Sequence, residues 1–149
     1  MPTNLTELFL GDPAGWDACT LALLSVHTLW GGHLITVAGG GATTVRLVER
    51  GASHERRYQF DQGRTQAQAL LRLCIKHDLL ATSLPHRPHL IPDEAHTLLE
   101  LSRDRRRFGL SVWAADEQPP GLRAILDAIL ALRARTDGLE PVYSGPYRG

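Results

Sequence analysis

The sequence predicts a single α+β domain, in which an antiparallel sheet with elements in the order ββββ-α-ββ-α has its helices packed on one face. Three features predict this: short alternating segments separated by glycines, two amphipathic helical stripes, and a strand hairpin between the helices. The length of 149 residues fits one domain. We expect residues 1–17 to form an N-terminal extension and residues 138–149 to form a flexible or partner-docked tail.

Four strands are expected in the first half of the chain. Ser25 and His27 alternate with apolar neighbours, which is the period of a half-buried strand, and Gly31-Gly32 supply a hairpin turn. The expected strands cover residues 21–30, 34–38, 43–50 and 57–61.

Apolar residues at helical spacing predict two helices. The first begins near Thr65, where Thr65 and Gln68 have the form of a capping box, and the second follows Pro119-Pro120. Residues 97–101 and 107–113 form a hairpin between them. The buried stripes are expected to be Ala67, Leu70, Leu71 and Cys74 in the first helix, and Leu122, Ile125, Leu126, Ile129 and Leu130 in the second.

The composition argues against several classes of protein. Sixteen basic and sixteen acidic residues give a formal net charge of zero, so no overall field attracts nucleic acid or a membrane. Residues 18–45 lack formal charge but are broken by glycines, as strands are rather than a spanning helix. The N-terminus lacks the basic region of a signal peptide, and two cysteines are too few for a disulfide framework. We therefore expect a reduced, cytoplasmic protein.

One segment carries most of the groups capable of chemistry. Residues 84–96 include His86, His89, Asp93 and His96, which are donors that zinc accepts. Their spacing matches no common zinc motif, and three prolines extend the backbone. A polar connecting loop is the simpler interpretation, and a metal-dependent hydrolase with Asp93 or Glu94 as base is the alternative.

Other candidate residues suggest contacts with a partner. Arg105 and Arg106 belong to an arginine-rich turn, which fits a solvated hairpin or a contact with an acidic protein. Trp30 precedes a glycine turn and is expected to be partly exposed, and Tyr143 and Tyr147 are possible anchors in the tail. The glycines at 39–41 lack the lysine of a phosphate-binding loop and are expected to form a turn.

The order of these segments resembles a type of uncharacterised small bacterial domain. The resemblance covers residues 21–135 and rests on patterns rather than signatures: Leu70-Leu71 through Leu79-Leu80, Pro92-Asp93-Glu94-Ala95 leading into residues 98–101, and Pro119-Pro120 before Leu122. It implies a bacterial protein and carries no established activity.

Taken together, these observations favour a non-catalytic protein-interaction or assembly module, such as an accessory subunit or a toxin-neutralising type of protein. Its partner is expected to be another protein or a second copy, with no cofactor. The expected contact residues are His86, His89, Trp30, Arg105, Arg106, Tyr143 and Tyr147.

Overall fold

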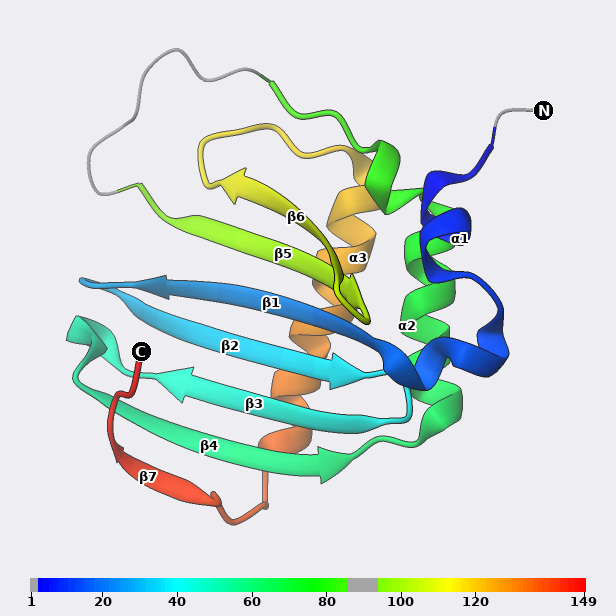
Figure 1. Cartoon of the computed structure of the whole chain (residues 1–149). Coiled ribbons are helices and arrows are strands. Elements are labelled where there is room, and N and C mark those ends of the chain that lie inside the picture. Colours follow the sequence, from blue (N-terminus) through cyan, green and yellow to red (C-terminus); the bar gives the residue numbers. More distant parts are fainter. Residues whose placement is uncertain (1–2, 86–93) are drawn as a thin grey trace.

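The computed structural model describes residues 3–85 and 94–149. Its centre is a seven-stranded sheet in the order β6-β5-β1-β2-β3-β4-β7, in which every neighbouring pair is antiparallel (Figure 1). The strands are β1 (Cys19–His27), β2 (Gly31–Ala38), β3 (Ala42–Val48), β4 (His54–Asp61), β5 (His96–Arg103), β6 (Arg106–Trp113) and β7 (Tyr143–Pro146).

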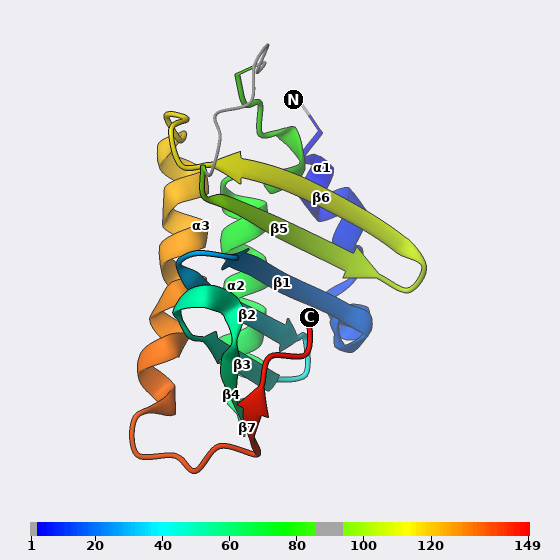
Figure 2. The same ribbon diagram turned by 90° about the vertical axis from the view of Figure 1, so that its left-hand side faces the viewer.

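The two long helices lie on one face of this sheet. They are α2 (Arg64–Lys76) and α3 (Pro120–Leu130), and a view along the sheet shows both on the same side (Figure 2). A third, short helix, α1 (Leu5–Leu10), lies near the start of β6, where Arg106 donates to the Phe9 carbonyl oxygen at 3.1 Å. The face of the sheet opposite α2 and α3 is called the open face below.

The predicted α+β class with an antiparallel sheet is confirmed, but the predicted order of elements is incomplete. The observed order is α-ββββ-α-ββ-α-β, with α1 before the first strand and β7 after the last helix. The side chain of Asn4 caps α1 by accepting from the Glu7 amide at 2.8 Å. Contacts from Asp78, which accepts from the amide and hydroxyl of Thr6 at 2.9 Å, hold the helix in place. These contacts span more than 70 residues, so local sequence patterns do not reveal them.

The predicted capping box at Thr65 is wrong. Helix α2 begins at Arg64, its N-cap is Gly63, and no side chain caps it. Gly63 has a φ of 87°, a left-handed conformation that glycine adopts without a Cβ clash. Asp61 fixes the turn by accepting from the Gly63 amide at 2.8 Å.

The hydrophobic core lies between the sheet and the two long helices. From the sheet it takes Leu21, Leu23, Ile35, Val45, Leu99 and Leu101, and from the helices Ala67, Leu71, Cys74, Leu122, Ile125 and Ile129. Cys19 and Cys74 are unpaired and buried, and burial raises the pKa of Cys74 to about 12. This thiol stays protonated near neutral pH, which makes it a core residue rather than a nucleophile.

Candidate interaction surface

A row of leucines crosses the middle of the open face. Leu24 of β1 lies opposite Leu98 of β5 on one side and Leu34 of β2 on the other. All three side chains are partly exposed, whereas the alternate residues of the same strands, such as Leu23 and Leu99, are fully buried under the helices. The strand pairing therefore gathers three leucines, from segments up to 74 residues apart, on the side without helices.

The next row towards the β1–β2 turn is also largely apolar. It contains Val26 of β1, Val48 of β3 and the ring pair formed by His96 and Trp113, whose centroids are 4.5 Å apart. The three leucines together with Val26, His96 and Trp113 form what we call the apolar patch: Leu24, Val26, Leu34, His96, Leu98 and Trp113.

Towards the other end of the strands, the open face carries small and polar side chains. The row beside Ala22 contains Gly109, Glu100, Thr36, Thr44 and Gln59. A shallow depression here is lined by Thr20, Thr36, Ala38, Thr44, Gln59 and Asp61 among others. Small side chains let another backbone approach a sheet closely, so this part of the face is shaped for contact rather than for enclosing a small molecule.

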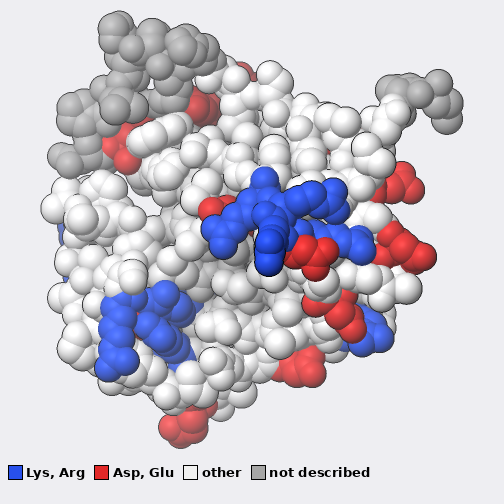
Figure 3. Space-filling view, viewed as in Figure 1, with Lys and Arg blue, Asp and Glu red and all other residues white. Residues whose placement is uncertain are grey.

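Viewed from the side of the open face, positive side chains gather at two places (Figure 3). One group lies at the β5–β6 turn and consists of Arg103, Arg105, Arg106 and Arg107. The guanidinium of Arg106 lies 5.1 Å from the centroid of the Phe9 ring. The guanidinium of Arg103 packs against Gly11 and Gly15. The contact is so close that a Cβ atom at either glycine would lie within 2.6 Å of a guanidinium nitrogen. The β5–β6 turn is therefore held against the N-terminal segment by Arg103 and Arg106.

The second group surrounds Glu55 of β4, whose side chain has no exposed surface. Arg46 donates to both carboxylate oxygens, at 3.0 and 2.8 Å, and Arg57 donates to one of them. The backbone amide of Arg148 completes the set at 2.8 Å. A buried carboxylate is tolerated when charged donors satisfy it, and here it holds the C-terminal segment on the sheet.

These contacts fix the charge of Glu55. Hydrogen bonds from Arg46, followed by those from Arg57 and the Arg148 amide, outweigh the burial of the carboxylate and lower its pKa to about 2. Hydrogen bonding to the charged form favours that form. Glu55 is therefore a carboxylate throughout the neutral range and does not act as a proton donor there.

Arginine–aromatic contacts reinforce the C-terminal segment. Arg57 lies 5.1 Å from the centroid of the Tyr143 ring and Arg148 lies 4.6 Å from it, so the ring has a guanidinium from the sheet and one from the tail. Arg46 lies 5.6 Å from the centroid of Tyr147. Such contacts contribute about 0.5–1 kcal/mol each at exposed sites. The tail expected to be flexible or partner-docked thus includes a strand that pairs with β4 of its own chain.

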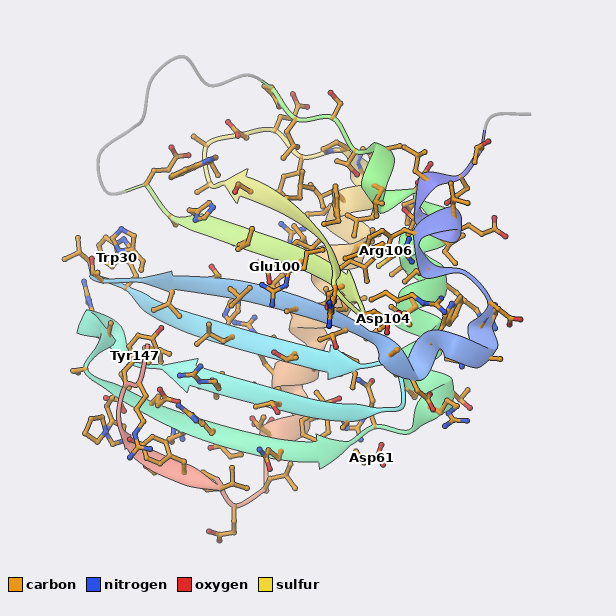
Figure 4. The ribbon with its side chains drawn as sticks, viewed as in Figure 1. Trp30, Asp61, Glu100, Asp104, Arg106 and Tyr147 are labelled. Atoms are coloured by element: carbon orange, nitrogen blue, oxygen red, sulfur yellow. The ribbon has the colours of Figure 1, made fainter. Side chains whose placement is uncertain are left out.

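The residues expected to contact a partner fall into two groups (Figure 4). Trp30 lies at the β1–β2 turn with 56% of its surface exposed, beside Arg50 at 5.1 Å. Tyr143 and Tyr147 lie towards the same end of the strands, on and beside β7. Arg105 and Arg106 lie at the opposite end, in and beside the β5–β6 turn. The arginines and the tail aromatics therefore flank the open face, whereas His86 and His89 lie outside the described residues.

The hypothesis of a metal site rests mostly on the part of the chain that is not described. Only His96, of its four proposed ligands, is in the described ranges, and its ring lies against Trp113. Within residues 3–85 and 94–149, no group of three or more His, Cys, Asp or Glu side chains could hold a metal ion.

Sequence reasoning missed the apolar patch and Glu55. The stretch from Leu21 to Leu24 is apolar throughout, so its alternation does not distinguish the buried face from the open one. Glu55 stands in a run of charged residues, which is typical of a solvated turn. The sequence did offer one indication of an ion pair: Glu55 and Arg57 are two residues apart in a strand, which places both side chains on the same face of β4.

Comparison with known proteins assigns no relative to this chain. No protein-family model, curated protein or solved structure matches it. The helices found in the described ranges are all too short or too polar to cross a membrane.

Proposed function

We propose that this protein is a non-catalytic protein-interaction module that binds a partly apolar, acidic segment of a partner protein on the open face of its sheet. The observation that carries the proposal is the apolar patch. It lies on the face that neither α2 nor α3 covers, and it is contiguous across β6, β5, β1 and β2. Contiguous exposed apolar surface of this kind is characteristic of interaction sites.

The charges beside the patch support an acidic partner. Two guanidinium groups, those of Arg46 and Arg57, bind the single carboxylate of Glu55, and the guanidinium of Arg148 lies nearby over the Tyr143 ring. At the β5–β6 turn four arginines accompany Asp104 and Glu100. Since the whole chain has a net charge of zero, this excess of positive charge is local to these two regions. Acidic groups at the rim of a partner would complement it.

The protein's own tail supports the proposed chemistry of recognition. Residues 143–148 add to the sheet as an extended segment, held by main-chain pairing, stacked aromatic rings and an ion cluster. Pairing of an extended peptide with a sheet edge is a common mode of recognition. Here the tail pairs with β4, which is separated by β3 from β2, the nearest strand of the apolar patch.

Selection from a random peptide display library on the immobilised full-length protein tests the proposal. We expect the enriched sequences to combine leucine or aromatic residues with Asp and Glu, and to bind more weakly as salt is raised. Leu24→Asp, at the centre of the patch, should lower the affinity of a selected peptide at least tenfold. Ala22→Arg serves as a second variant on the open face, because it adds a bulky side chain at a position that is not in the core.

The matched control is Leu139→Asp, which makes the same substitution at a side chain that is 43% exposed and lies outside the sheet. It should leave the affinity unchanged. Equal losses for Leu24→Asp and Leu139→Asp would contradict the proposal, as would selected peptides without acidic residues or a failure to select any peptide.

A further inference from the structure

The outer edge of β6 is unpaired among the described residues. The Ala114 amide donates to the Ala95 carbonyl oxygen at 2.9 Å, and residues 95 and 114 continue the register of the β5–β6 ladder. Because bonded pairs alternate in an antiparallel ladder, the even-numbered residues of β6 bond to β5. Arg107, Gly109 and Ser111 therefore direct their backbone N–H and C=O groups to the outer side.

In residues 3–85 and 94–149, nothing gives this edge the usual protection against pairing. Residues 108–113 carry no charged side chain, and Gly109 and Ser111 are exposed. The opposite edge of the four-strand meander, at β4, is covered by β7. An uncharged, exposed edge strand is a template for another strand, and proteins protect such edges with charges, bulges or a covering element.

We propose that β6 pairs antiparallel with β6 of a second copy of this chain, about a two-fold axis perpendicular to the sheet that passes beside Leu110. This axis keeps the helices of both copies on the same side of the joint sheet. The even-numbered residues of β6 point to the helix side, so each of them must lie opposite an even-numbered residue of the second copy, and each odd-numbered residue opposite an odd-numbered one. Leu110 then lies opposite Leu110 of the second copy, and Gly109 lies opposite Ser111. The outward backbone groups of each strand meet those of the other.

The side chains fit this register. On the helix side, Phe108 lies opposite Val112 of the second copy, and Leu110 meets its own equivalent. On the open face, Arg107 lies opposite Trp113, where a guanidinium and an indole ring form a favourable pair. Pairs directly opposite each other contribute about 0.2–1 kcal/mol each.

The charges beyond the strand ends also fit. The antiparallel arrangement brings the arginine-rich β5–β6 turn of one copy beside the segment that follows β6 in the other. That segment contains Asp116 and Glu117, and the turn contains four arginines and Asp104. The two-fold axis repeats the match at the other end, so opposite charges lie together at both ends of the interface.

The oligomeric state of the full-length protein tests this inference. Sedimentation velocity over a concentration series should give a species of twice the 16.4 kDa of one chain. Ser111→Pro removes an outward amide without removing a bond to β5, and it should raise the dimer dissociation constant at least tenfold. Ser111→Ala, which keeps the amide, should not. A monomer at every concentration, or equal dimers for both variants, would overturn the inference.

Cross-linking tests the register itself and does not depend on a proline. Leu110→Cys places two thiols opposite each other in a non-bonded pair, where Cβ atoms are about 4.5–5.5 Å apart and a disulfide can form. Ser111→Cys faces Gly109 instead and is the matched control. We expect mild oxidation to link the first variant into dimers and not the second. The reverse result, or no link in either, would contradict the register. Since neither experiment uses a peptide ligand, both outcomes are independent of the proposed function.

Discussion

Glu55 holds the C-terminal segment on the sheet through a cluster of three charged side chains, its own and those of Arg46 and Arg57, together with the backbone amide of Arg148. Its carboxylate is fully buried, whereas the side chains of its partners Arg46 and Arg57 are 20% and 29% exposed. Removing one member of a buried ion cluster leaves the others without partners, which costs more than the cluster itself contributes. The neutral isostere Glu55→Gln should therefore lower the free energy of unfolding by about 3 kcal/mol, measured by urea denaturation.

The control for Glu55→Gln is Glu100→Gln, on the same face but half-buried on β5. It should change the free energy of unfolding by less than about 0.5 kcal/mol. If the two variants unfold alike, the cluster does not hold the tail as described.

His33 and Glu55 both contribute to the dependence of stability on acid. Burial and the charge of Arg133 lower the pKa of His33 to about 4 from 6.5, and hydrogen bonds from Arg46 and Arg57 lower that of Glu55 to about 2 from 4.5. In both cases the unfolded chain takes up the proton first, so stability falls as the pH falls. The stability that depends on neutral His33 is lost between about pH 6.5 and 4, and the stability that depends on ionised Glu55 is lost between about pH 4.5 and 2.

His33→Leu should therefore flatten the loss of stability between pH 6.5 and 4.5, by roughly 1–2 kcal/mol over that window, and leave the loss at lower pH in place. Urea denaturation at a series of pH values measures this, and an NMR titration of the His33 ring gives its pKa directly. A His33 ring that titrates near 6.5 would refute the assignment.

At the scale of elements, β7 is the strand that local sequence does not predict. It has only four residues, ends on Pro146, and pairs with residues about 90 positions earlier in the chain. Truncation after Asp137 should expose the edge of β4 and Glu55, and lower the stability by about 3 kcal/mol, like Glu55→Gln.

A synthetic peptide of residues 139–149 added to the truncated protein should restore stability and give saturable binding by calorimetry. A peptide with Tyr143→Ala and Tyr147→Ala is the control and should bind more weakly, because it lacks the rings that stack on Arg57 and Arg46. Equal binding by both peptides would show that the rings do not contribute.

The regular elements could be predicted because their signals are local. Alternation and glycine turns located β1 to β4, and the hairpin expected at residues 97–101 and 107–113 is His96–Arg103 paired with Arg106–Trp113. The apolar stripes of the two helices predicted that Cys74 and Ile125 are buried, and both are. By contrast, Gly63 replaces Thr65 as the cap of α2 because a turn fixed by Asp61 precedes the helix.

The candidate surface was less predictable because it depends on register between distant segments. The sequence indicated two separate groups of contact residues, and both lie around the open face. They are Arg105 with Arg106, and Tyr143 with Tyr147. The leucines between them looked like core, since a strand with apolar residues on both faces gives no alternation. Only the pairing of β1 with β2 and β5 reveals that Leu24, Leu34 and Leu98 lie side by side on the uncovered face.

For the whole molecule, the arrangement separates stability from recognition. The core between the helices and the sheet contains most of the fully buried side chains, and the open face carries the apolar patch with an arginine group on either side. Both helices and the core can therefore stay unchanged while a partner binds. A second copy paired at β6 would extend the open face across both chains.

The most direct test of this account is an NMR titration of the isotopically labelled protein with an acidic, leucine-containing peptide selected against it. We expect the amide signals that shift to cluster on β5, β1 and β2 around Leu98, Leu24 and Leu34, and on Arg46 of β3 beside them. Shifts that cluster instead on the solvent side of α2 and α3 would contradict the assignment of the open face as the binding surface.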